Sequence, residues 1–554
     1  MSTTVKLITY TKDELLHGYS LYGVALTLFF SGLFFFLKKE WSIHSPSKLP
    51  IVGIDSPGYF GLLKARRHFV TNGRQILKDA YYKYYKKNFV ITTNSCEKII
   101  LTFDQTKELS NAPEDTVSFI HAINELMMAD YTGLNRAPGS HILKDVIRIK
   151  LTQNLGSMKE AQMEETQFAL NTEMPQCTTD GCYSPTPILI CLVRMLIKLI
   201  MAEWTSVNIY SATLRMVARI SGRAFIGLPL CRDEDWLTVS INFTNDVFNT
   251  AAKLATISKL IRPFYAYIQN STKAIEAHRR KARALLAPTI QRRLEEETLG
   301  KESGTAHREY NDLLQWLSDR IESQHKNVDH LAELQLSTSM ASIHTTTSSL
   351  VNTILDLAEH QEYIQPIREE IEAVISTNDG MLDRRALRKM RKTDSFLKES
   401  MKARLGLLTF NRKVMKSLTL SDGTYLPKGT LIAAPHSIFS TDPDYIEDPE
   451  AFDGFRWYKK ALALKDGMVD NNYSASAAPE NLAFGQGKHA CPGRFFATEE
   501  IKLILIYILL QYDLKYPEGQ SRPDNIDNGE FTFPDFRQKL LFKKLPGPKK
   551  FSFL

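Results

Sequence analysis

A single cysteine stands in a stretch rich in glycine and proline near the C-terminal end of the chain, Phe484-Gly485-Gln486-Gly487-Lys488-His489-Ala490-Cys491-Pro492-Gly493-Arg494. Glycine permits backbone angles that a side chain forbids, so Gly485 and Gly487 suit a tight turn. The proline and glycine after Cys491 suit the entry to a helix, which we predict over 495–512. The positive end of that helix favours a thiolate, a good ligand for a soft metal centre. The alternative is a buried cysteine in an ordinary turn.

A run of threonines forms the second candidate, within Ala341-Ser342-Ile343-His344-Thr345-Thr346-Thr347. Threonine is a poor helix former, so this run favours a local groove or a widened turn in an otherwise helical stretch. His344 can pass protons near neutral pH, and Thr345 offers a hydroxyl. The alternative is that these hydroxyls only bond neighbouring carbonyls.

A third candidate pairs opposite charges on one helical face. Glu399 and Lys402 are three residues apart, a spacing at which helical side chains meet. Lysine lacks the planar fork with which arginine binds a carboxylate twice, so we expect a weaker contact than arginine would make.

These three groups must be positioned by a large, mainly helical chain. The 554 residues are 43% hydrophobic and 24% charged, with a net charge of +7. No basic run interleaved with aromatics indicates nucleic acid, and six cysteines do not form a disulfide framework. Periodicity predicts helices over 60–90 and most of 113–350, with short strands at 89–92 and 98–101.

The N-terminus predicts a membrane anchor. Residues 18–37 are twenty uncharged residues, long enough to span a bilayer, with Lys38 and Lys39 directly after them. This charge bias places residues 1–17 in the lumen and the residues after the span in the cytosol. A proline-containing hinge over 38–55 then joins the span to the remainder of the chain. The alternative is a cleaved signal peptide. A second apolar stretch, 177–202, is atypical; we interpret it as either a membrane-dipping insertion or translated intron sequence.

The cysteine stretch resembles the haem-binding loop of cytochromes P-450, in which phenylalanine, two glycines, a basic residue, cysteine and glycine recur at this spacing. The resemblance covers nearly the whole chain apart from 177–202 and 401–405. It implies a mainly α fold with a smaller β region, one haem domain over 56–554, and haem b. Cys491 is then the axial ligand of the haem iron.

The resemblance also implies roles for further residues. Thr345, with His344 in place of the family's usual acid, would handle dioxygen and protons. Glu399 and Lys402 would form a structural lock with Arg456, although the family has arginine where this chain has Lys402. The expected cofactor-binding positions are Phe484, Gly485, Gly487, His489, Gly493, Arg148 and Arg412. For Arg148 a solvated helical face is the alternative.

The implied activity is insertion of one oxygen atom of O2 into an apolar small molecule, with electrons from an NADPH-dependent flavoprotein reductase. The expected location is the endoplasmic reticulum membrane, with a single span. The stretches Ala341–Thr347 and Gly487–Ala497 resemble fungal hydroxylases of secondary metabolism, such as those of the gibberellin pathway. This resemblance favours a terpenoid or indole-diterpene substrate over a polyketide or alkaloid. An inactive haem-binding pseudoenzyme is the other alternative, because of Lys402 and the 177–202 segment.

Overall fold

The computed structural model describes residues 49–56, 58–136, 140–174, 204–303, 310–402, 404, 406–465, 468–477 and 482–546, together with five isolated positions before residue 49. The predicted anchor over 18–37 and the apolar segment over 177–202 lie essentially outside this part. Within the described residues, no helix combines the length and apolar character that crossing a membrane requires.

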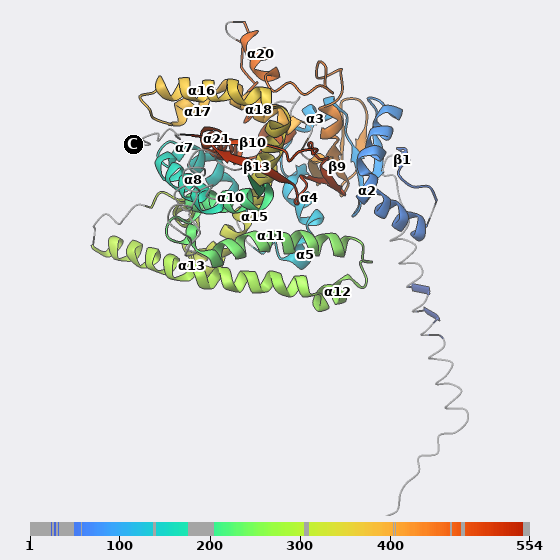
Figure 1. The fold of residues 1–554 in the computed structure, drawn as a ribbon. Helices are drawn as coiled ribbons and strands as arrows, with labels where there is room; N and C mark the ends of the chain where they lie inside the picture. Colours follow the sequence, from blue (N-terminus) through green and yellow to red (C-terminus); the bar gives the residue numbers. More distant parts are fainter. Residues whose placement is uncertain are drawn as a thin grey trace, which may run out of the picture.

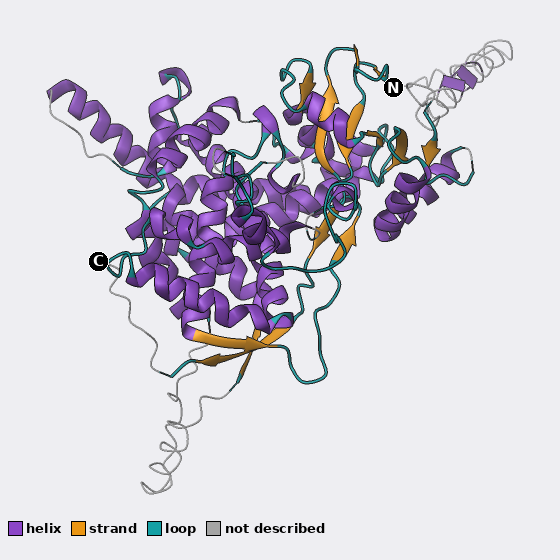
Figure 2. Ribbon diagram, turned by 90° about the horizontal axis from the view of Figure 1, so that it is seen from above, coloured by secondary structure: helices purple, strands orange, loops and turns teal. Residues whose placement is uncertain are grey.

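Most of the described chain is helical (Figure 1 and Figure 2). The helices are α2 (Tyr59–Lys83), α3 (Phe103–Leu109), α4 (Phe119–Leu126), α5 (Ala129–Thr132), α6 (Ser140–Val146), α7 (Thr152–Asn154), α8 (Lys159–Glu173), α10 (Ile209–Phe225), α11 (Glu234–Ala255), α12 (Arg262–Ile268), α13 (Asn270–Ser303), α14 (Leu313–Arg320), α15 (Val328–Glu359), α16 (Ile364–Ser376), α17 (Arg384–Lys389), α18 (Arg391–Lys402), α19 (His436–Phe439), α20 (Arg456–Leu462) and α21 (Arg494–Gln511). A single π-helical turn, Ile147–Leu151, follows α6.

In the described part of the chain, the strands form one larger sheet and three small ones. The larger sheet has the order β1-β2-β3-β9-β6-β4, with bounds Ile51–Val52, Phe89–Thr92, Glu97–Ile100, Leu431–Ala434, Thr409–Val414 and Val117–Ser118. A second sheet has the order β10-β13-β5, with bounds Tyr512–Lys515, Lys539–Lys544 and Thr205–Asn208. Two hairpins pair β7 (Leu418–Thr419) with β8 (Tyr425–Leu426), and β11 (Ile526–Asn528) with β12 (Phe531–Phe533).

The opening hairpin confirms the sequence prediction closely. Strands β2 and β3 pair antiparallel, with Phe89 opposite Ile100 and Thr92 opposite Glu97. Their β-branched and aromatic residues are buried, as expected for strands of a sheet that packs against a core. Figure 2 shows that helices make up most of the described domain and that the strands lie in two groups beside them.

The largest hydrophobic core lies among α10, α15, α16, α18 and α21. Helix α15 begins at a capped end, where the Asn327 side chain accepts a hydrogen bond from the His330 N–H. Residues 346–358 of α15 are buried throughout. A helix that is buried on all sides is held mainly by packing, which overrides the low helix propensity of its threonines.

The threonine run corrects one expectation. Helix α15 continues without a break from Val328 to Glu359, so the run does not widen a helical turn. The Thr345 and Thr347 hydroxyls donate to the carbonyls of Ala341 and Ile343, at 2.8 and 2.7 Å. These bonds to the preceding turn let threonine remain helical, which is the alternative stated above. Among the described residues, π-helical geometry occurs instead at Ile147–Leu151.

Candidate active site

The cysteine loop is a tight turn that ends at the start of α21. The Cys491 N–H donates to the Phe484 carbonyl at 2.7 Å, which closes the loop. Gly485 and Gly487 have φ angles of +70° and +65°, in the left-handed region that side chains rarely adopt. Helix α21 then runs over Arg494–Gln511, within one residue of the prediction at each end.

Gly487 also permits a close contact between two distant segments. A Cβ atom added there would lie 2.2 Å from the Ser110 carbonyl oxygen, much closer than van der Waals contact. Glycine is therefore required at this position both for its φ angle and for the approach of the segment after α3.

We predict that Gly487→Ala lowers the free energy of unfolding by about 3 kcal/mol or more, because backbone strain of about 1–3 kcal/mol adds to the clash with Ser110. Chemical denaturation measures the change. Gly380→Ala is the matched control, since Gly380 has a φ of +77° but nothing within 4 Å of an added Cβ. Equal losses in the two variants would show that the contact with Ser110 contributes nothing.

The sulfur of Cys491 faces backbone donors. Burial raises the pKa of the Cys491 thiol, whereas the N–H groups of Gly493 and Arg494 hydrogen-bond the sulfur and act in the opposite direction. Gly493 is the N-cap residue of α21 and offers no side chain, so the helix start is open toward the cysteine. A side chain at Gly493 would meet Ile147 of the π-helical turn at 3.8 Å, so that turn lies against the loop.

A buried cation without a carboxylate partner lies near the same loop. Arg412 of β6 is 2% exposed, and its Nη1 donates only to the Asn411 carbonyl, at 2.8 Å. Its Nε has no hydrogen-bond partner, and within the described chain no carboxylate lies within ion-pair distance. Burial lowers the pKa of Arg412 to about 10, with the charge of Glu114 opposing this effect. A buried guanidinium in this state fits an anionic ligand such as a haem propionate.

His489 adds a second nitrogen donor to this region. Its Nε2 donates to the Ala112 carbonyl at 2.9 Å, and its Nδ1 lies 3.1 Å from a Glu114 carboxylate oxygen. Burial lowers the pKa of His489. The positive charges of Arg412 and Lys144 lower this pKa further, whereas the negative charge of Glu114 raises it. The structure thus brings Arg412 and His489 together around Glu114, although their positions in the sequence are far apart.

Arg148 lies on the π-helical turn, but its side chain is 56% exposed and pairs with Asp145 at 2.9 Å. This is the solvated helical face that the sequence left open as the alternative. Its role toward a propionate stays a prediction, and Lys144 on the preceding helix is the cation whose charge acts on His489 and Glu114.

Helix α15 exposes a narrow stripe on an otherwise buried surface. Ala341 and Thr345, four residues apart, are exposed, and Ser337 one turn earlier is half-buried. Residues at this spacing lie on one helical face, so the stripe forms an open wall beside the core. A small residue and a hydroxyl on such a wall suit the edge of a flat prosthetic group. Thr345 therefore has the exposure that its predicted role requires.

His344 points in a different direction. Its Nε2 donates to the Ile241 carbonyl on α11 at 3.1 Å, and its Nδ1 lies 3.5 Å from the Tyr210 hydroxyl on α10. Burial lowers the pKa of His344. These contacts join three helices, and proton transfer by His344 stays a prediction.

The predicted lock between Glu399, Lys402 and Arg456 is formed in the structure. Lys402 Nζ lies 2.8 Å from Glu399 Oε1 and 3.0 Å from the Pro449 carbonyl. Arg456 Nε lies 3.2 Å from Glu399 Oε2, and its Nη2 donates to the Asp448 and Ala451 carbonyls. Burial lowers the pKa of Lys402, whereas the neighbouring Glu399 raises it. Lysine thus reaches the carboxylate through one nitrogen, as expected from its shape.

His436, at the start of α19, provides a pH-dependent prediction. Burial lowers its pKa from 6.5 to about 4. Because the unfolded chain binds this proton more readily, the stability from neutral His436 is complete above pH 6.5 and is lost as pH falls toward 4. We expect about 3 kcal/mol of unfolding free energy to disappear across that range, and His436→Asn to flatten the dependence. Urea titrations at several pH values test this, and parallel curves for the two proteins would contradict it.

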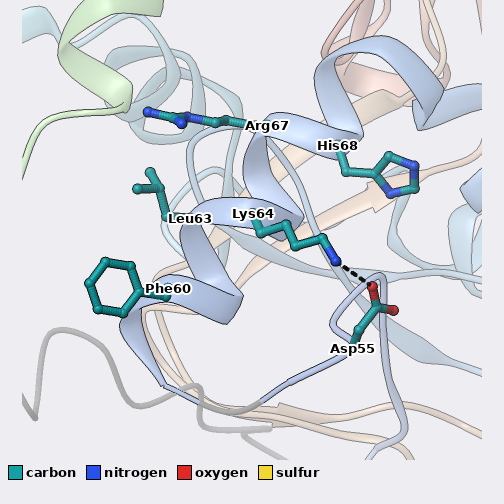
Figure 3. Close-up of a pocket in the computed structure, with 6 residues that line it drawn as sticks. All are labelled: Asp55, Phe60, Leu63, Lys64, Arg67 and His68. Carbon is teal, nitrogen blue, oxygen red and sulfur yellow. Dashed lines mark ion pairs between the residues drawn. The ribbon is translucent and has the colours of Figure 1, made fainter.

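A surface pocket of about 670 Å³ lies elsewhere, against the N-terminal half of α2 (Figure 3). Its lining residues are Asp55, Phe60, Leu63, Lys64, Arg67 and His68. Figure 3 shows Lys64 reaching toward Asp55, an ion pair of 3.7 Å. None of the predicted site residues lines this pocket, so it is separate from the candidate active site.

Comparisons with known proteins show the family to which the chain belongs. A family model described as "Cytochrome P450" matches residues 188–542. The chain is 37% identical to "Cytochrome P450 monooxygenase AN1598" from Emericella nidulans, over 84% of this chain and 82% of that protein. It is 32% identical to "Ent-kaurene oxidase P450-4" from Gibberella fujikuroi, over 91% of this chain and 94% of that protein. The chain therefore belongs to the cytochrome P450 family and is a haem-dependent monooxygenase, an oxidoreductase.

A solved structure shares the fold. The retinoic acid-bound cyanobacterial CYP120A1 superposes with a TM-score of 0.62 at 17% identity, covering 90% of this chain and 100% of that one. Members of the family hold haem through a cysteine thiolate, and they use O2, a redox partner and a small-molecule substrate. The expected mainly helical fold with a smaller β region is confirmed.

Several residues around the loop were missed by sequence reasoning. Glu114 and the Ser110 carbonyl lie against the loop from segments more than 340 residues earlier. They stand in stretches without a distinctive motif. Only the tertiary structure places them.

Proposed function

We propose that this chain is a membrane-anchored haem-thiolate monooxygenase that oxidises an apolar secondary metabolite, with Cys491 as the axial ligand of the iron. The observation that carries the proposal is the Cys491 loop: its sulfur accepts N–H bonds at the start of α21, and the buried, unpaired Arg412 acts on the same loop. These features match a thiolate ligand beside an anionic group.

When bound, haem supplies O2 binding and activation, and the overall reaction consumes two electrons and two protons, places one oxygen in a C–H bond and releases the other as water. The chain contributes the surroundings. Donors at Gly493 and Arg494 would stabilise the thiolate, and Arg412 would hold a propionate. His489, whose two ring nitrogens contact the Ala112 carbonyl and Glu114 in this structure, stays the predicted second propionate partner. Thr345 presents its hydroxyl on the exposed stripe of α15, where it can orient water and hold a proton.

A terpenoid substrate is the favoured class. The support is similarity to proteins named ent-kaurene oxidase from Gibberella fujikuroi and Fusarium fujikuroi, each 32% identical over 91% of this chain. Polyketides and alkaloids are the alternatives. The pseudoenzyme alternative depended on Lys402 failing to form the lock. Lys402 hydrogen-bonds Glu399 and the Pro449 carbonyl, which argues against that alternative.

The proposed setting is the endoplasmic reticulum membrane, with the haem domain in the cytosol and an NADPH-dependent flavoprotein reductase as the electron donor. The support is the apolar run over 18–37 and the surface beside its hinge. There Phe60 is 82% exposed and lies near Lys64 and Arg67 (Figure 3), a combination that suits an anionic membrane surface.

The test is expression in a yeast host with a matching reductase. Microsomes should contain the protein, and the reduced protein with carbon monoxide should show the thiolate-type absorption band. Incubation with ent-kaurene and with a panel of indole-diterpenes, polyketides and alkaloids then identifies products by mass spectrometry. Absence of the thiolate band would overturn the proposed chemistry, whereas oxidation of polyketides or alkaloids alone would overturn the substrate class.

A further inference from the structure

A buried carboxylate near the C-terminal end of α15 holds two arginines that have no role in the site described above. Asp356 is completely buried, and one of its oxygens accepts hydrogen bonds from Arg522 Nε and, at 3.4 Å, from Arg404 Nη2. The Ser400 hydroxyl of α18 donates to the other oxygen at 2.5 Å. Asp356, Arg404 and Arg522 are called the Asp356 cluster below.

Arg522 joins the chain after β10 to the face of α15 that carries Thr345. Its side chain is 7% exposed, and its Nη2 donates to Asn352 Oδ1 at 2.8 Å, one turn before Asp356. Asn352 and Asp356 follow Thr345 by seven and eleven residues, a spacing that keeps all three on one helical face. Arg522 is therefore fixed to the buried continuation of the exposed stripe.

The hairpin of β11 and β12 begins directly after this contact. Asn525, the residue before β11, accepts from the Arg522 guanidinium at 3.3 Å and donates to the Arg404 carbonyl at 3.3 Å. The Asp356 cluster thus fixes the point at which the chain enters the hairpin.

The far end of the hairpin contacts both sides of the candidate active site. The Phe531 ring lies edge-on to Phe248 of α11, with centroids 5.4 Å apart, and α11 also contacts α15 beside the exposed stripe. Glu530 pairs with Lys98 at 2.5 Å, and Lys98 donates to Asn411, which directly precedes the buried arginine of β6. The hairpin therefore lies between the stripe and the expected propionate partner.

Aromatic rings follow one another along this segment. The centroids of Phe531, Phe533 and Phe536 are 6.3 and 5.8 Å apart in turn, and Phe536 lies 4.6 Å from Tyr210 of α10. Phe531 and Phe533 are half-buried, and Phe536 is exposed. Aromatic surface that the core leaves partly uncovered suits contact with an apolar ligand.

We propose that the Asp356 cluster positions the β11–β12 hairpin as one wall of the substrate site, so that Arg522 controls how tightly a large apolar molecule is held beside α15. The proposal rests on the function proposed above. Arg522 is a positioning residue, because it acts through the hairpin. Arginine suits this role since its planar fork reaches Asp356, Asn352 and Asn525 together, whereas lysine offers a single nitrogen.

Arg522→Lys is the test variant, because it keeps a positive charge beside Asp356 but loses the fork. Arg293→Lys is the matched control. Arg293 is also 7% exposed, and it binds Asp312 through two hydrogen bonds of 2.7 Å that join α13 to the start of α14.

Hydrogen exchange followed by mass spectrometry measures the hairpin directly and needs no substrate. Amide exchange over 523–533 should become about tenfold faster in Arg522→Lys, because charge-assisted hydrogen bonds at the start of the hairpin are lost. Arg293→Lys should leave this exchange unchanged. The same exchange rate in Arg522→Lys and the unmodified protein would overturn the proposal.

Ligand titration of the haem-loaded protein then measures the site. Clotrimazole, a large apolar imidazole, should bind about tenfold more weakly to Arg522→Lys, since it loses contact with a fixed wall. Free imidazole, which is too small to reach the hairpin, should bind equally to both proteins. Unchanged affinity for clotrimazole, or equal weakening of both ligands, would contradict the proposed role.

A second variant covers a failure of Arg522→Lys to fold. Asn525→Ala leaves Arg522 and Asp356 paired and removes only their link to the hairpin, so it should give the same faster exchange and the same selective loss of clotrimazole binding. Absence of the thiolate band in the unmodified protein would instead overturn the function proposed above, and the exchange rates would still decide whether the Asp356 cluster holds the hairpin.

Discussion

Replacing Cys491 with serine is expected to abolish the thiolate-type band of the reduced carbon monoxide complex and to reduce product formation to background. A serine oxygen keeps the shape of the side chain but is not ionised at neutral pH, so the iron loses its anionic sulfur ligand. Absorption spectroscopy and product analysis on the same microsomal preparation measure both effects.

Cys96→Ser is the control for this prediction. Cys96 lies between β2 and β3, and its sulfur contacts only Thr93 and Ser95 among the described residues. This variant should keep both the band and the activity. A Cys491→Ser protein that retained a thiolate-type spectrum would show that another cysteine binds the iron.

The second large effect is expected at the lock. Glu399→Gln should lower the free energy of unfolding by about 3–5 kcal/mol, because it leaves the Lys402 and Arg456 cations buried without their shared anion. The side chains concerned are 0, 6 and 8% exposed for Glu399, Lys402 and Arg456, so water cannot replace the lost charge. Denaturation of the purified protein gives the change, and haem content should fall with it.

Glu125→Gln is the matched control for the lock. Glu125 also pairs with a lysine, Lys413, at 2.8 Å, but its side chain is 44% exposed. An exposed pair of this kind contributes about 0–1 kcal/mol. A similar small loss in Glu399→Gln would mean that Arg456 and Lys402 are held by their backbone carbonyl partners alone.

Local sequence was sufficient wherever neighbouring residues determine the conformation. The opening hairpin over 89–100, the helix after the cysteine and the turn glycines at 485 and 487 all follow from patterns of a few residues. The pairing of Glu399 with Lys402 follows from helical spacing. The threonine run was misread because propensity describes an isolated helix, whereas α15 is held by burial on nearly every side.

The remainder of the site depended on contacts between distant segments. Sequence order says nothing of why Gly487 must approach the Ser110 carbonyl, or that Arg412 and His489 meet at Glu114. Nor does it show that His344 is directed at α11 while Thr345 faces open space.

The sequence by itself determined the chemistry of this protein, because a cysteine, its turn glycines and the following helix are contiguous and act over short range. Only the tertiary structure decided which charges are buried without partners and which way the polar side chains of α15 face. The physical reason is that burial and the electrostatic surroundings of a group depend on every segment that packs around it.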